Sequence, residues 1–242
     1  MKTPVSLIVL RKVRCNDRTD IIGAYSRELG PVSFAIPSGA GKGASRRRAL
    51  LMPMSLVEGI ADMNPTRELG RLSQIRPLEV LQGIAANPVK SAISLLMADL
   101  LGVALRQGQP DEAMWEYIAE SLRVLDVLPQ SSAANFHLVF IYGLGRLAGI
   151  EPDISTYTQG ACFDLRDGRF RHVLPLHGDV LTGREAEAVR LLSRMNYQNM
   201  GHIRLSRADR NAILDGMLHY MTIHYVAVDH LRSLDIVREL FA

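Results

Sequence analysis

The feature that most constrains the fold is a change of sequence pattern after residue 78. Before this point, five short runs are rich in Val, Ile and Leu and are separated by turn-forming residues, at positions 5–14, 19–25, 31–36, 49–57 and 69–76. Runs of this length and composition are typical of β-strands. Five such strands in a segment this short favour a small closed barrel. The OB-fold fits best, and an SH3-like barrel is the nearest alternative.

After residue 78 the apolar residues recur with a helical period. Asn87 is placed to cap a helix that begins at Pro88, and its apolar side chains recur every three or four positions. Capping-box patterns begin at Thr182 and Ser206. Helices are expected at about 88–104, 111–127, 132–148, 183–194, 207–228 and 233–241.

The segment 149–181 is irregular and contains an Asp167–Gly168 pair between two alternating arms, which predicts a β-hairpin. We therefore expect an α+β multidomain chain. Residues 1–78 form an OB-fold nucleic-acid-binding domain, and residues 79–242 form an all-α helical domain with this hairpin as a small insertion.

Charge is divided unevenly between these two parts. Residues 1–78 hold 13 Lys and Arg against 6 Asp and Glu, whereas residues 79–242 hold 15 against 19. A basic first part indicates a polyanionic partner such as nucleic acid. The alternative is a chance imbalance on a solvated surface, but the cations also cluster.

The clearest cluster is the stretch IPSGAGKGASRRRALLMP at residues 36–53, with three glycines, four cations and no acid. Glycine lets a backbone approach a partner closely, and cations near phosphates release counterions. We interpret it as a DNA-facing loop of the barrel. The candidate nucleic-acid-binding residues are Arg11, Lys12, Arg14, Arg27, Lys42, Arg46, Arg47 and Arg48.

Aromatic residues are sparse in the first part, where only Tyr25 and Phe34 occur. Single-strand binding proteins stack bases on aromatic side chains, so this scarcity favours electrostatic, sequence-tolerant binding over base reading. We expect Phe34 to belong to the barrel core.

Three kinds of chemistry find little support. Residues 38–45 resemble a P-loop, but Ile36 and Gly43 occupy positions that require Gly and Ser or Thr, and a strand is predicted to follow. A zinc site usually needs four Cys or His ligands in tight pairs, and Cys162, His172 and His177 are only three and widely spaced. No nucleophile–base pair or acid cluster is evident. We therefore expect no catalytic site, no metal and no cofactor.

The chain has two distant cysteines, Cys15 and Cys162, which fits a reducing compartment. Its N-terminal apolar run is too short and too closely followed by charge to be a signal peptide, and no run reaches the length of a membrane helix. These observations predict a cytoplasmic protein without membrane contact.

Two stretches carry a family resemblance. The opening LIVLRKVRCNDRTDIIGAYSRELGPVSFAIPSGAGKGASRRRALLMPM and the ending LHYMTIHYVAVDHLRSLDIVREL resemble the RecO family of bacterial DNA repair and recombination mediators. The opening follows the family's order of strand, polar turn, strand, glycine-rich basic segment and Leu/Pro run. The resemblance extends over essentially the whole chain.

The resemblance implies an N-terminal OB-fold and a helical C-terminal domain. It implies binding to single- and double-stranded DNA, annealing of complementary strands, and contact with RecR and with the C-terminal tail of single-strand-binding protein (SSB). Together with RecR, such proteins help RecA replace SSB on DNA. Many relatives carry a four-cysteine zinc ribbon, but residues 151–181 hold only Cys162, so we expect the zinc to be lost and the hairpin to hold by packing alone.

The predicted barrel and its positive charge also fit an alternative, an RNA-binding OB module on a helical scaffold. The resemblance of the C-terminal stretch favours the DNA repair mediator.

Overall fold

The structure is a computed structural model of the 242-residue chain, and it describes residues 2–38, 44–64, 69–228 and 231–240. The chain forms two compact units, Met1–Val127 and Leu128–Ala242. The first unit therefore includes three helices that follow residue 78. The domain boundary expected after residue 78 instead separates the strands from these helices.

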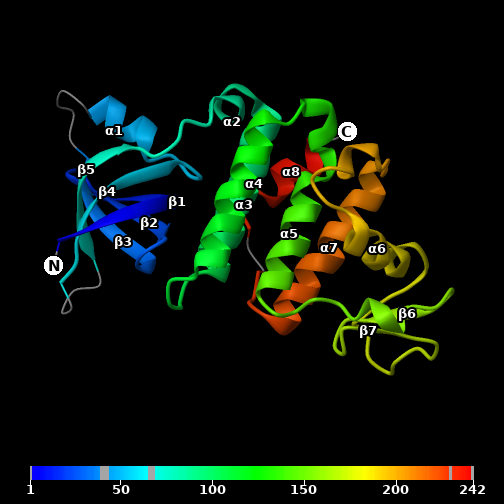
Figure 1. Cartoon of the computed structure of the whole chain (residues 1–242). Coiled ribbons are helices and arrows are strands. Elements are labelled where there is room, and N and C mark those ends of the chain that lie inside the picture. Colours follow the sequence, from blue (N-terminus) through cyan, green and yellow to red (C-terminus); the bar gives the residue numbers. More distant parts are fainter. Residues whose placement is uncertain (1, 39–43, 65–68, 229–230, 241–242) are drawn as a thin grey trace. The chain divides into compact units, whose positions relative to one another are not determined.

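Five strands close into a barrel in the first unit (Figure 1). Their order around the barrel is β1-β2-β3-β5-β4, and β1 also pairs with β4 to close it. Every pair is antiparallel except β3 with β5. The OB-like barrel predicted from the sequence is confirmed. The strands are β1 (Lys2–Asn16), β2 (Thr19–Ser26), β3 (Gly30–Pro37), β4 (Leu56–Asp62) and β5 (Gly70–Pro77).

Alternate residues of these strands fill the barrel. Leu7, Ile22, Phe34 and Val57 are almost completely buried and belong to one apolar cluster. Because side chains on a strand alternate between its two faces, the residues between them point outward. Phe34 is thus a core residue, as expected.

The expected fourth strand at residues 49–57 is wrong. Ala44–Leu50 forms a short helix, α1, and strand β4 begins only at Leu56. An unbroken apolar run does not distinguish strand from helix, and the preceding arginines are good helix formers. The helix ends before Pro53, and Met54 adopts a left-handed conformation with φ of 63°. Leu51 directly after α1 lies in the barrel core and fixes the helix to it.

Three helices complete the first unit: α2 (Gln82–Ala86), α3 (Pro88–Ala104) and α4 (Glu112–Val127). The Asn87 side chain accepts hydrogen bonds from the backbone N–H groups of Val89 and Lys90, which confirms the predicted cap. Helix α3 packs on β1, where Ile8 and Leu10 are buried although they lie outside the barrel core cluster.

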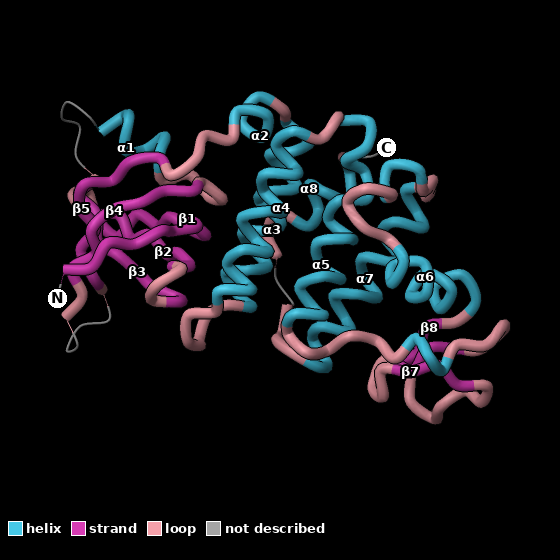
Figure 2. Tube along the Cα trace, in the orientation of Figure 1, coloured by secondary structure: helices cyan, strands magenta, loops and turns pink. Residues whose placement is uncertain are grey.

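The second unit is built mainly from helices (Figure 2). Its regular helices are α5 (Phe136–Leu147), α6 (Gly183–Arg194), α7 (Arg207–His224) and α8 (Leu234–Glu239), with short 3-10 turns η1 (Gln130–Asn135), η2 (Ile154–Thr156) and η3 (Met200–His202). The Ser206 side chain caps α7 by accepting a hydrogen bond from Asp209 N, as predicted. Thr182 makes no such bond at the start of α6, so the same sequence pattern predicted only one of two caps.

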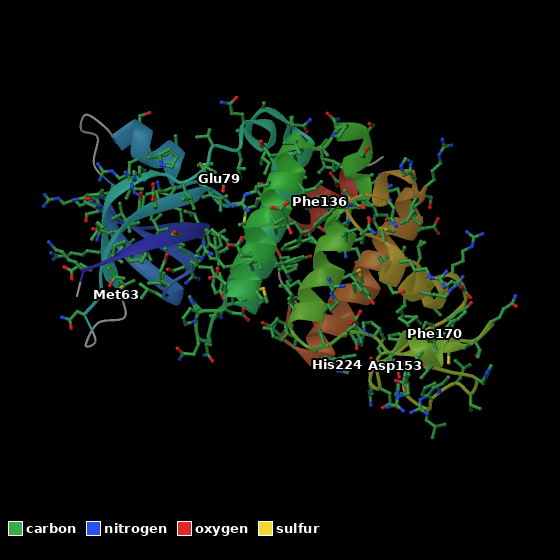
Figure 3. All side chains as sticks on the ribbon, viewed as in Figure 1. Met63, Glu79, Phe136, Asp153, Phe170 and His224 are labelled. Carbon is green, nitrogen blue, oxygen red and sulfur yellow. The ribbon has the colours of Figure 1, made fainter. Side chains whose placement is uncertain are left out.

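A small sheet of order β7-β6-β8 follows α5. Strands β6 (Cys162–Asp164) and β7 (Arg169–Arg171) form the predicted hairpin, and β8 (Val180–Leu181) adds a third strand that sequence did not indicate. Phe163 and Phe170 form the core of this sheet, where the Phe170 ring lies 5.1 Å from that of Tyr157 (Figure 3).

The expected packing of this sheet is accompanied by buried polar contacts that the sequence did not predict. The buried Asp164 carboxylate accepts hydrogen bonds from the backbone N–H groups of Arg166 and Asp167, and Arg171 Nε lies 3.2 Å from Asp164 Oδ2. A buried carboxylate needs such donors, because it is costly to leave the charge without partners. Asp164 is therefore a polar centre for a sheet with very short strands.

Candidate nucleic-acid interface

The glycine-rich basic segment connects β3 to β4. Lys42 lies outside the described residues, and of Arg46 the structure describes the backbone, in α1, but not the side chain. Arg48 is exposed, and Arg47 donates a hydrogen bond from Nη1 to Pro37 O at 3.4 Å. Both line one shallow depression together with Lys12. The structure thus brings together one cation of β1 and two of α1 at the end of the barrel.

One of the three arguments against a P-loop, that a strand follows the basic loop, is wrong. The basic loop leads into a helix, not into a strand. Ile36 and Gly43 still do not match the motif.

Two of the three candidate cations of β1 already have acidic partners. Lys12 Nζ lies 3.1 Å from Asp20 Oδ2, and Arg14 Nη2 lies 2.9 Å from Asp17 Oδ1. Arg11 makes no ion pair with any described residue. Phosphate binding by a paired cation requires that the existing pair be exchanged, so Arg11 is the most available of the three.

Arg27 is held by helix α4. Its guanidinium pairs with Glu112 and lies 2.8 Å from Glu116 Oε1, and it also lies over the Trp115 ring, 5.1 Å from the centroid. The hydrogen bond to Glu112 raises the pKa of Arg27. The structure therefore places this charge against two carboxylates and not with the other candidates.

The two aromatic candidates are buried. Phe34 is in the core, and the Tyr25 hydroxyl accepts a hydrogen bond from Asp111 N at 3.1 Å at the start of α4. Neither ring can serve as a stacking platform for a base without leaving its site. Recognition at this barrel would have to rely on charge.

A row of side chains on the outer surface of the barrel was not predicted from the sequence. Strand register aligns Val13 with Ile21, Ile21 with Ala35 and Ala35 with Arg71, across four strands. Arg71 is exposed and makes no ion pair with any residue that the structure describes. The polar–apolar–polar alternation at residues 71–73 could have indicated that Arg71 points outward.

The candidate metal ligands have separate partners. Cys162 Sγ donates to Arg171 O at 3.2 Å, His172 Nε2 lies 2.9 Å from Thr158 Oγ1, and His177 Nε2 lies 3.5 Å from Asp164 Oδ1. Within residues 2–38, 44–64, 69–228 and 231–240, no group of three His, Cys, Asp or Glu is arranged to hold a metal ion.

Two of the three histidines near the C-terminus also bind the sheet region. His219 Nε2 lies 2.9 Å from Asp179 Oδ1, and His224 Nε2 lies 2.6 Å from Leu165 O (Figure 3). His230 lies outside the described residues. No described helix is both long and apolar enough to cross a membrane.

A closed five-stranded OB-like barrel with basic outer residues, followed by helices, defines the class of the protein. Family models give the same division: "Recombination protein O N terminal" matches residues 1–81 and "Recombination protein O C terminal" matches residues 85–235. The chain therefore belongs to the RecO family of DNA repair proteins.

Several relatives support this assignment over almost the full length. The chain is 34% identical to "DNA repair protein RecO" of Phocaeicola vulgatus over 235 residues, 97% of each chain. It is 33% identical to the protein of that name from Bacteroides fragilis, strain ATCC 25285, and 32% identical to that from Porphyromonas gingivalis, strain W83, again over 97% of each chain.

Proposed function

We propose that this protein is a recombination mediator that binds single- and double-stranded DNA through the phosphate backbone. The observation that carries the proposal is a set of cations of the barrel and of α1 in a RecO family chain that pair with no described carboxylate, above all Arg11, Arg48 and Arg71. Buried Tyr25 and Phe34 favour backbone contacts over base reading. Lys42 and Arg46 remain candidates on the sequence alone.

In this proposal the protein is a binding protein and not an enzyme. It anneals complementary strands, contacts SSB and RecR, and with RecR helps to load RecA in the cytoplasm. Support comes from the family assignment. Sequence-tolerant phosphate binding suits such a role because annealing must operate on any sequence.

Fluorescence anisotropy with labelled single-stranded DNA across a salt series tests the DNA-binding step. Each neutralised phosphate contributes about 0.7 to the log–log salt slope on single strands and about 0.9 on duplex. Replacing Lys42, Arg46, Arg47 and Arg48 together by Ala should weaken binding to unrelated sequences by similar factors and flatten the slope. Unchanged affinity and slope in the folded quadruple variant would mean that this segment is merely solvated.

Competition distinguishes DNA from RNA as the partner. Unlabelled single-stranded DNA and RNA of equal length and sequence should be compared as competitors in the same assay. Strong preference for RNA would support an RNA-binding module instead, and an annealing assay with complementary DNA strands would then show little acceleration.

We further propose that the acidic, apolar-tipped SSB tail binds in the second unit. Most side chains of α5 are buried, so that helix offers little free surface. A groove of about 760 Å³ lined by α6 and α7 fits the tail better, because Arg194 lies there with apolar Leu191 and Leu205. The groove also holds three acids, and two of these pair with its other arginines, Glu187 with Arg190 and Asp209 with Arg184. Arg194 has no ion-pair partner among the described residues, and a cation beside apolar side chains complements an acidic peptide with an apolar end.

Titration with a labelled tail peptide tests this site. Replacing Arg194 by Ala should weaken peptide binding, while Arg204→Ala, which removes an exposed arginine outside the groove, should not. Equal affinities for both variants, or peptide-induced shifts confined to residues 1–78, would argue against the groove.

A further inference from the structure

A recess in the first unit lies between the outer barrel surface and the end of α3. Its volume is about 190 Å³, and it is lined by residues of β1, β2 and β3, by Met63 after β4, and by the end of α3 with the two residues that follow it. Two arginines from opposite sides, Arg11 and Arg106, contribute to its lining. We call it the Arg11–Arg106 recess.

Arg11 reaches this recess by lying across its neighbouring strand at Gly23. A Cβ atom at Gly23 would lie 2.8 Å from both Cγ and Nε of Arg11, so any side chain there would displace the arginine. Gly23 pairs with Arg11 on one side and with Ser33 on the other. The absence of a side chain at this one position therefore lets the arginine run across β2 towards β3, where the recess lies.

Arg106 comes from outside the barrel sequence. It follows Leu105, a buried residue that ends α3 and donates its backbone N–H to Leu101 O. Arg106 itself is exposed. Neither it nor Arg11 makes an ion pair within the described part of the chain. Two guanidinium groups are thus placed at one recess, and no carboxylate of the described residues pairs with either of them.

The physical balance at this recess favours an anion. The C-terminus of α3 carries a partial negative charge of about half a unit, which two full positive charges outweigh. Leu10, Val32 and Leu105 supply apolar walls, and charge interactions strengthen where water is displaced by apolar surface. Guanidinium groups also match the planar oxygen pairs of phosphates through paired hydrogen bonds.

We propose that the Arg11–Arg106 recess binds one backbone phosphate of a DNA strand. The strand then passes from the outer barrel surface to the end of α3, so the interface includes a residue of the helical segment. This inference rests on the proposed DNA-binding function. It adds Arg106, and it assigns Gly23 a positioning role through Arg11.

Salt-dependent binding of single-stranded DNA to full-length protein tests the proposal. Arg106→Ala and Arg11→Ala should each weaken binding about fivefold at about 0.1 M salt and lower the log–log slope by about 0.7, the value for one phosphate contact. If both arginines bind the same phosphate, the double variant should lower the slope by the same amount as either single variant and not by twice as much. Gly23→Ala should act in the same direction without changing the charge.

Arg14→Ala is the matched control. It removes the same charge from the same strand, but Arg14 is already paired with Asp17 and does not line the recess, so its slope change should be smaller. The fluorescence of Trp115, the single tryptophan and part of the same unit, verifies that each variant is folded. Arg106 is exposed, so Arg106→Ala decides the question even if Gly23→Ala fails to fold.

The outcomes separate the two levels of the proposal. Absence of salt-sensitive DNA binding in the wild-type protein would refute the proposed function itself. Normal wild-type binding with unchanged affinity and slope in Arg106→Ala would overturn only the recess, and Arg11 would then act through contacts elsewhere on the barrel. Strictly additive slope changes would show that the two arginines bind different phosphates, which also contradicts a shared recess.

Discussion

The two compact units differ most in how they can respond to protons. All seven histidines lie in residues 128–242, and residues 1–127 contain none. The first unit is a barrel around an apolar core, with helices attached in part by Arg–Glu pairs. The second contains a small sheet whose carboxylates meet Arg and His side chains. Near neutral pH, acidification should therefore act on the second unit alone.

His137 should contribute most to this difference in pH response. It is buried in α5, and burial, followed by the nearby Arg210 charge, lowers its pKa from 6.5 to about 3. Arg210 in turn donates from Nε to Asn135 Oδ1 at 3.2 Å, and Asn135 donates to Met200 O and Ile203 O. This polar cluster joins α7, η1 and η3 inside the second unit.

The largest effect should come from the protonation of His137. Below pH 6.5 His137 is protonated in the unfolded chain but stays neutral in the folded chain. The free energy of unfolding therefore falls as pH is lowered towards 3. The loss should reach about 3 kcal/mol by about pH 4. Hydrogen exchange of α5 amides across pH measures it, and His137→Gln should remove most of this dependence.

The exposed His202 provides the matched control. His202→Gln should leave the pH dependence of the second unit unchanged. If Trp115 fluorescence in the first unit followed the same pH profile as α5 exchange, the contrast between the two units would be wrong.

A second, similar effect is expected at the small sheet. Replacing Asp164 by Ala leaves Arg171 without its buried partner and leaves the N–H groups of Arg166 and Asp167 without an acceptor. Arg171 is partly exposed and keeps Asp167 as a partner, so most of the cost, about 3 kcal/mol in all, comes from the two N–H groups that lose their acceptor. Urea unfolding followed by exchange of β6 amides measures it. Asp167→Ala, which removes a half-exposed partner of the same arginine, should cost under about 1 kcal/mol. Equal costs would show that packing, not Asp164, holds the sheet.

A smaller effect without pH dependence is expected in the first unit. A Cβ atom at Gly83 would lie 2.0 Å from Asp126 O, so Gly83→Ala must push α2 away from the end of α4. Overpacking of this kind costs about 2 kcal/mol. Denaturant unfolding monitored by Trp115 fluorescence should show this loss equally at pH 7 and pH 5.

Gly102 in α3 is the corresponding control, because a Cβ there would meet nothing within 4 Å. Gly102→Ala should stabilise the same unit by about 0.5–1 kcal/mol through helix propensity alone. A destabilising Gly102→Ala would indicate that the end of α3 is strained.

Local signals explain what the sequence could predict of this fold. The strands of residues 5–14, 19–25 and 31–36 follow from alternation and turns, and the cap at Asn87 follows from a two-residue pattern. Helix α1 was missed because an apolar run looks alike in helix and strand. Strand β8 was missed because its two residues become a strand only by pairing with β6.

The candidate site was predictable only as a list of cations. Sequence identifies the charges but not their partners, because Arg27 meets Glu112 across 85 positions and Arg123 meets Glu79 across 44. Arg106 was missed because it is a single arginine after a helix, with no cluster around it. The availability of a cation is a property of the folded chain, and this property separates Arg11 from its neighbours on β1.

The smallest effect is expected for Arg27, a residue that sequence nominated for DNA binding. Its charge is opposed by Glu112 and Glu116 and it lies over Trp115, so a phosphate would have to displace two carboxylates to reach it. Arg27→Gln should therefore change single-stranded DNA affinity less than about twofold and leave the salt slope nearly unchanged, whereas Arg11→Ala should flatten the slope. Anisotropy titrations of both variants under identical salt conditions make the comparison. A slope change at Arg27 as large as that at Arg11 would show that pairing with α4 does not withdraw this charge from DNA. The helix would then be part of the interface, with its acids exchanged for phosphates as the strand binds.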